Sequence, residues 1–117
     1  MSLGGLAGNH DAFVDHCEHF GAASSYCDYL MRAEIGLRDV STQDWNRSYA
    51  DDRVTHVAAI DPGLVWGVDA ADTAALIDNV RLIGFGDKDD RLLATDFDAS
   101  GFAQLLPDAE IDRIVPA

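Results

Sequence analysis

Basic residues are scarce in this chain, and lysine is nearly absent. The 117 residues carry one lysine, Lys88, and seven arginines against 21 acidic residues, which gives a formal net charge of −13. A surface of this sign repels phosphate backbones and anionic lipid headgroups. The composition therefore argues against nucleic-acid binding and against a membrane-surface role. It is typical of a very soluble protein or of one that lives in salt.

Long hydrophobic runs are also lacking. No stretch approaches the roughly 18 apolar residues of a membrane-spanning helix, although 48% of the residues are hydrophobic. Residues 1–8 have neither the basic start nor the apolar core of a signal peptide. Because Met-Ser-Leu resembles a cloning leader, we expect the natural N-terminus to lie upstream, and a signal peptide on the parent protein stays open. The length and composition fit one globular domain with a modest core.

Only two cysteines are present, Cys17 and Cys27, and they lie ten residues apart with Gly21 between them. Two short helices that fold back at the glycine would bring the thiols together. A disulfide would imply an oxidising compartment, such as the periplasm or the exterior. The alternative is a pair of half-buried free thiols in a cytoplasmic protein, and the spacing leaves both interpretations open.

Helical signals dominate the first part of the chain. Residues 11–20 have apolar side chains at helical spacing, with Asn9 or Asp11 as the N-cap. Ser24 or Ser25 could cap a second helix that runs to residues 31–33. Ser41, three residues before an aspartate, predicts a short helix over residues 45–49. We expect residues 1–43 to form a helical cap or insertion.

The second part of the chain predicts alternating strands and helices. Strands are expected over residues 54–60, 80–85 and 110–115, with helices over residues 69–76 and 95–106. The strands start 26 and 30 residues apart, which suits parallel βαβ units. We therefore predict an α/β fold in residues 44–117, with about three parallel strands and flanking helices. Since such a sheet needs cover on both faces and at its edges, we expect a homo-oligomer or contact with the remainder of the same polypeptide.

Three segments of this part resemble a known family. They are DWNRSYADDRVTHVAAIDPGLVWG (residues 44–67), NVRLIGFGDKDD (residues 79–90) and FAQLLPDAEIDRIVPA (residues 102–117). In order and spacing they resemble the C-terminal half of α/β-hydrolases, in the branch of predicted dienelactone hydrolases and platelet-activating-factor acetylhydrolase-like esterases. The resemblance implies a serine hydrolase that acts on carboxylic esters or lactones and needs no cofactor.

The family's catalytic triad runs in the order serine, acid, histidine. The resemblance assigns the acid to the turn after residue 85, with Asp89 as first choice and Asp87 and Asp90 as alternatives, and a solvated acidic turn is the competing interpretation. Ser2 in MSLGG matches the end of the family's nucleophile elbow, unless the match is an accident of the leader. The family's histidine follows the last strand, and the four histidines here lie elsewhere. We therefore expect a fragment that is inactive by itself.

Other site types fit the sequence less well. The group formed by His10, His16, Cys17, His19 and Cys27 lacks the ligand spacing of a zinc site, so no metal site is predicted. Trp45 and Trp66 either line an acyl pocket or pack in the core. The alternative function is a small acidic α/β binding or interaction module without catalysis.

Overall fold

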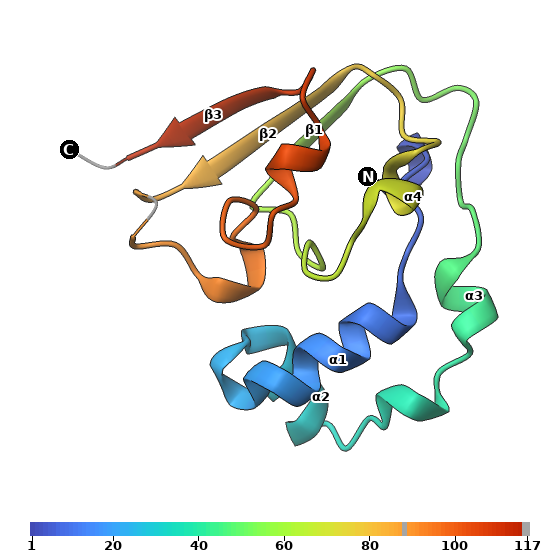
Figure 1. Cartoon of the computed structure of the whole chain (residues 1–117), viewed down its shortest axis with the longest axis vertical. Helices are drawn as coiled ribbons and strands as arrows, with labels where there is room; N and C mark the ends of the chain where they lie inside the picture. The colour runs from blue at the N-terminus through green and yellow to red at the C-terminus, as the bar shows by residue number, and fades with distance from the viewer. Residues whose placement is uncertain (88, 116–117) are drawn as a thin grey trace.

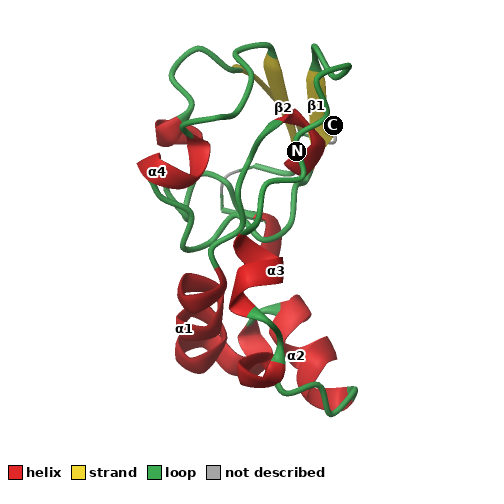
Figure 2. Cartoon of the chain, turned by 90° about the vertical axis from the view of Figure 1, so that its right-hand side faces the viewer, coloured by secondary structure: helices red, strands yellow, loops and turns green. Residues whose placement is uncertain are grey.

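The computed structural model describes residues 1–87 and 89–115 and has a mixed α/β architecture. Three strands, β1 (Val57–Ile60), β2 (Val80–Phe85) and β3 (Glu110–Ile114), form an open parallel sheet in the order β1-β2-β3. The sheet and α4 (Ala70–Thr73) form one end of the molecule. The other end holds α1 (His10–Phe20), α2 (Ser25–Arg32) and α3 (Thr42–Asn46), as Figures 1 and 2 show. The predicted α/β class and the three parallel strands are confirmed.

Only one face of the sheet is covered by the described residues. Along β2, Val80, Leu82 and Gly84 are buried, whereas the alternate residues are exposed or half-buried. The buried face packs against a single core cluster, which consists of Val65, Leu76, Val80, Leu82, Phe97, Phe102 and Ala103. On the opposite face, Phe85 is 50% exposed and Ile114 is 49% exposed. This differs from the usual parallel sheet, which is buried on both faces.

Two of the capping predictions for the helical region are confirmed, whereas Ser24 precedes α2 without a capping side-chain hydrogen bond. The side chain of Asn9 accepts a hydrogen bond from the backbone N–H of Ala12 at the start of α1. Ser41 does the same for Asp44 at the start of α3. Among the described residues, no helix has the length and apolarity needed to cross a membrane.

The predicted helix over residues 95–106 is wrong. Two 3₁₀ turns, Leu93–Thr95 and Ala103–Leu105, stand there instead, separated by a loop. The carboxylate of Asp96 accepts hydrogen bonds from the backbone N–H groups of Asp98 and Ala99. Such local side-chain bonds to the backbone compete with the helical pattern, so the apolar spacing alone was not enough to form a helix.

Other predicted elements are present with different bounds. The strand predicted over residues 54–60 begins at Val57, because the N–H of Val54 is bonded to the carbonyl of Asp51 in a turn. The helix predicted over residues 69–76 is reduced to α4. The helix predicted over residues 45–49 is α3, which ends at Asn46 because Arg47 is extended.

A buried arginine joins the strands at their carboxyl ends. The side chain of Arg91 is 1% exposed and donates to Asp61, after β1, at 3.3 Å and to Asp98 at 3.4 Å. Asp98 also binds Arg113 of β3. A Cβ added to Gly84 of β2 would lie 2.8 Å from the guanidinium of Arg91, so a side chain there would force the guanidinium to shift. We call this group the arginine cluster: Arg91, Asp61, Asp98 and Arg113.

Replacing Arg91 by methionine should destabilise the fold. The substitution leaves Asp61 without its cation, and we expect the free energy of unfolding to fall by about 2 kcal/mol. The expected loss is below the full cost of breaking a buried ion pair, because the carboxylates of Asp61 and Asp98 keep some contact with solvent. Urea denaturation measures the change. The matched control is Arg53→Met, which removes an exposed pair with Asp51 and should leave the midpoint unchanged. Equal losses for the two variants would contradict this role of Arg91.

The disulfide in the structure joins Cys17 of α1 to Cys27 of α2, so of the two interpretations of the cysteines the bridge is the one found. Because the bridge restricts the unfolded chain, the Cys17→Ser/Cys27→Ser variant should lose about 2–3 kcal/mol of stability for a loop of this length. Urea denaturation with and without reductant measures the loss. The double variant should show no further response to reductant. An unbridged wild type would instead give two free thiols per chain under denaturing, non-reducing conditions.

Candidate functional site

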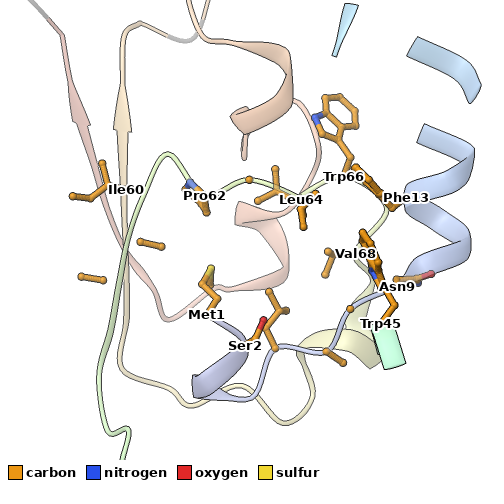
Figure 3. Close-up of a pocket in the computed structure, with 17 residues that line it drawn as sticks. Met1, Ser2, Asn9, Phe13, Trp45, Ile60, Pro62, Leu64, Trp66 and Val68 are labelled. Atoms are coloured by element: carbon orange, nitrogen blue, oxygen red, sulfur yellow. The ribbon is translucent and has the colours of Figure 1, made fainter. Parts of the chain in front are cut away.

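A pocket of about 340 Å³ lies between the N-terminal segment, the end of β1 and the helical region (Figure 3). Its size falls within the usual range for small-molecule sites. Most of its lining is apolar, with side chains from Met1, Leu6, Phe13, Trp45, Ile60, Pro62, Leu64, Val65, Trp66 and Val68. The pocket therefore suits an apolar ligand or an apolar part of one.

Two tryptophans form the wall toward the helices. Trp45 stacks on Phe13 of α1, with ring centroids 5.5 Å apart, and Trp66 stacks on His16 at 5.2 Å. The indole N–H of Trp66 donates to the carbonyl of Leu93 at 2.6 Å, which fixes that ring. Both tryptophans line the pocket, and Trp66 also packs against the core cluster.

The segment after β1 is held in an uncommon backbone conformation. Asp61 has φ 41° and Leu64 has φ 60°, which side-chain-bearing residues rarely adopt. The carboxylate of Asp61 accepts from Arg91 and from the N–H of Phe85. Backbone strain of this kind persists only where the surroundings hold it, and it gathers at functional sites. Here the strained residues lead directly into the pocket wall.

Of the predicted catalytic residues, all of which the structure describes, Ser2 is the one that reaches this pocket. It belongs to a 3₁₀ turn, Ser2–Gly4, and it lines the pocket together with Asn9 as the polar side chains. Asn9 is already used, since its amide donates to Asp72 and its oxygen caps α1. The hydroxyl of Ser2 is therefore one side-chain group that a ligand would meet, and Trp45 adds an indole N–H to the same lining.

The acidic turn after β2 lies apart from the pocket. Asp87, Asp89 and Asp90 are exposed, and the N–H of Asp90 donates to the carbonyl of Asp87. None of these three carboxylates lines the pocket. Lys88, between them, lies outside the described residues. The structure thus does not bring Ser2 together with the predicted triad acid.

The histidines do not complete a triad at Ser2. Among the described residues, none of the four lines the pocket. His10 is buried and bonded to Thr42 and to the carbonyl of Leu37. His16 is buried with Nε2 at 3.0 Å from the hydroxyl of Ser24, and its Nδ1 has no hydrogen-bond partner in the described part of the chain.

No metal centre is formed by the predicted soft ligands. Cys17 and Cys27 are consumed by the disulfide. Over residues 1–87 and 89–115, no group of three or more His, Cys, Asp or Glu side chains could hold a metal ion.

Sequence reasoning missed Arg91, Asp61 and the pairing of His16 with Trp66. In the sequence Arg91 directly follows the acidic turn, and its partner Asp61 lies 30 residues before it. The available signal was the Asp-Pro-Gly turn directly after a strand, which places a carboxylate at the carboxyl edge of the sheet.

Comparison with protein-family models, with curated proteins and with solved structures gives no match for this chain.

The buried His16 predicts a stability that depends on pH. Burial lowers its pKa from 6.5, and the neighbouring His19 lowers it further. Below pH 6.5 the unfolded chain therefore binds a proton that the folded chain does not, so stability falls as the pH is lowered toward the native pKa. When the pH is lowered from 7.5 to about 5, wild type should lose more unfolding free energy than the His16→Gln variant. The exposed His56→Gln variant should keep the wild-type profile, and identical profiles for all three proteins would contradict the prediction.

Proposed function

We propose that this chain is part of a serine hydrolase of the α/β-hydrolase type that acts on carboxylic esters or lactones. The observation that carries the proposal is the position of Ser2, at an apolar pocket beside the end of β1. Ligands of open α/β sheets bind at the carboxyl ends of the strands. The chain order, with Ser2 ahead of the acidic turn after β2, agrees with the order serine, acid, histidine.

In this proposal the residues have separate roles. The hydroxyl of Ser2 attacks the ester carbonyl, the alcohol departs with the proton that the serine gives up, and water then hydrolyses the acyl-serine. The apolar wall formed by Trp45, Leu64 and Trp66 binds the acyl or alcohol group. Asp89, or its neighbours Asp87 and Asp90, orients the imidazole that takes the serine proton.

The proposal needs a histidine that the described residues do not bring to the pocket. We therefore propose that the remainder of the same polypeptide supplies it and moves the acidic turn and Ser2 into a common site. The isolated chain should then be a poor catalyst, because its serine lacks a general base.

An assay with p-nitrophenyl butyrate tests the proposal. Without additions, wild type and Ser2→Ala should hydrolyse the ester equally slowly. With imidazole added as a substitute base, wild type should exceed Ser2→Ala at the same imidazole concentration by about tenfold, a part of the usual contribution of a positioned base.

One observation favours a second candidate function, the non-catalytic binding module. Most of the described residues that line the pocket are apolar, and none of them is an acid or a histidine that could act as a general base. Under this alternative, wild type and Ser2→Ala would still bind apolar molecules but would give equal rates at every imidazole concentration. That result would contradict the hydrolase proposal.

A further inference from the structure

A modification motif lies at the end of α3. Asn46, Arg47 and Ser48 have the order Asn-x-Ser with a middle residue other than proline, which is the acceptor motif for N-linked glycans. The two other asparagines, Asn9 and Asn79, are followed two positions later by an aspartate and an arginine, so neither has the motif. Asn46 is therefore the one acceptor that the sequence offers.

The disulfide supplies an observation that is independent of the motif. N-linked transfer takes place outside the reducing cytoplasm, so the motif carries meaning only in a chain that is exported. A structural disulfide persists in the same oxidising compartments, and the structure joins Cys17 to Cys27. The export that permits the bridge also brings the motif to the glycosyl transferase.

The folded chain leaves room for a glycan at this position. Asn46 is exposed, and so are residues 47–50 that follow it. The helix α3 ends at Asn46 and Arg47 is extended, so the motif leaves the helix along one side of the molecule, as Figure 1 shows for α3 and the segment after it. Because N-linked glycans are bulky and need surface positions, this place is suited to one.

The fold uses one end of the Asn46 amide and leaves the other end available. Its Oδ1 accepts a hydrogen bond from the backbone N–H of His10 at the start of α1, at 2.8 Å. Its Nδ2 has no hydrogen-bond partner within residues 1–87 and 89–115. In a glycosylated asparagine a sugar replaces one hydrogen on this nitrogen, and the carbonyl oxygen stays an acceptor. The contact with α1 is therefore compatible with the modification.

We propose that Asn46 carries an N-linked glycan. The donor is an oligosaccharide joined to a lipid through pyrophosphate. The amide nitrogen of Asn46 bonds to the anomeric carbon of the first sugar, the bond from that carbon to the phosphate breaks, and the pyrophosphate leaves with the lipid while the amide gives up one proton. Ser48 supplies the hydroxyl that the motif requires. The proposal is independent of the hydrolase function.

Translation of the chain behind a cleavable signal peptide, in the presence of endoplasmic-reticulum microsomes, tests the proposal. Wild type should gain the mass of one glycan, and a peptide N-glycosidase should remove it. Ser48→Ala removes the motif and an exposed bond from the N–H of Ala50 but keeps Asn46, so this variant should stay unmodified. The matched control Ser48→Thr keeps the motif and should be modified. An unmodified wild type, or a glycan that persists in Ser48→Ala, would overturn the proposal.

Mass spectrometry of the chain purified from its natural source extends the test to the native molecule. The peptide that contains Asn46 should carry the glycan, whereas Asn9 and Asn79 should be unmodified. An Asn46 without sugar in that material would overturn the proposal.

Urea denaturation tests whether the folded structure accepts the glycan as the contacts imply. The glycosylated chain should unfold at a midpoint no lower than that of Ser48→Ala, since the bond from His10 to Oδ1 is kept in both. Asn46→Ala loses this bond and should unfold at a lower urea concentration. A glycosylated chain with a midpoint as low as that of Asn46→Ala would overturn the proposed attachment, because the sugar would then displace the contact with α1.

Discussion

A buried guanidinium holds the carboxyl edge of the sheet together, and much of the structure depends on it. Arg91 binds Asp61 after β1, donates to the carbonyl of Thr95 at 3.0 Å and stacks on Phe97, with its guanidinium carbon 3.8 Å from the ring centroid. In most parallel sheets, apolar cover on both faces keeps the strands in place. Here the described residues cover one face, and the arginine cluster adds polar cross-links between the strand ends on that covered side.

The shape of the pocket depends on the arginine cluster. Asp61 is fixed by Arg91 and by the N–H of Phe85, so the turn after β1 is tied to β2. The same turn contains Leu64 with its positive φ, and the strain is offset by the bonds that hold Asp61. From the other side, α1 closes the pocket through the stack of Phe13 on Trp45. A disturbance at Arg91 would therefore reach the pocket wall through the covalent chain, without any direct contact between the two.

The sequence predicted those elements whose signals are local. The strand over residues 80–85 is found with the predicted bounds, and Asn9 caps α1. Both signals are local, because an apolar run and a capping side chain determine the structure of residues next to them in the sequence. The prediction of a helix over residues 95–106 was wrong because the Asp96 carboxylate accepts hydrogen bonds from nearby N–H groups. These bonds compete with helical hydrogen bonds, and the apolar spacing does not reveal them. The role of Arg91 was not predictable from periodicity, since its partner Asp61 is brought close only by the folded sheet. Ser2 lines an apolar pocket, and its assignment as nucleophile stays a prediction, because which acid and which histidine would act with it cannot be derived from pairings within these residues.

The open face of the sheet bears on how the proposed hydrolase would be completed. Ile60, Phe85 and Ile114 leave apolar surface exposed there, beside an ion pair in which Arg81 binds Asp112 at 2.5 Å. A homo-oligomer would bring together two copies that each carry a net charge of −13, and this repulsion opposes association. Cover by the remainder of the same polypeptide would not face the same repulsion, because the charge of that remainder need not equal the charge of this chain. The same remainder is the proposed source of the catalytic histidine. Under the proposal, one partner would cover the sheet face that the described residues leave exposed and would supply the histidine that they do not bring to Ser2.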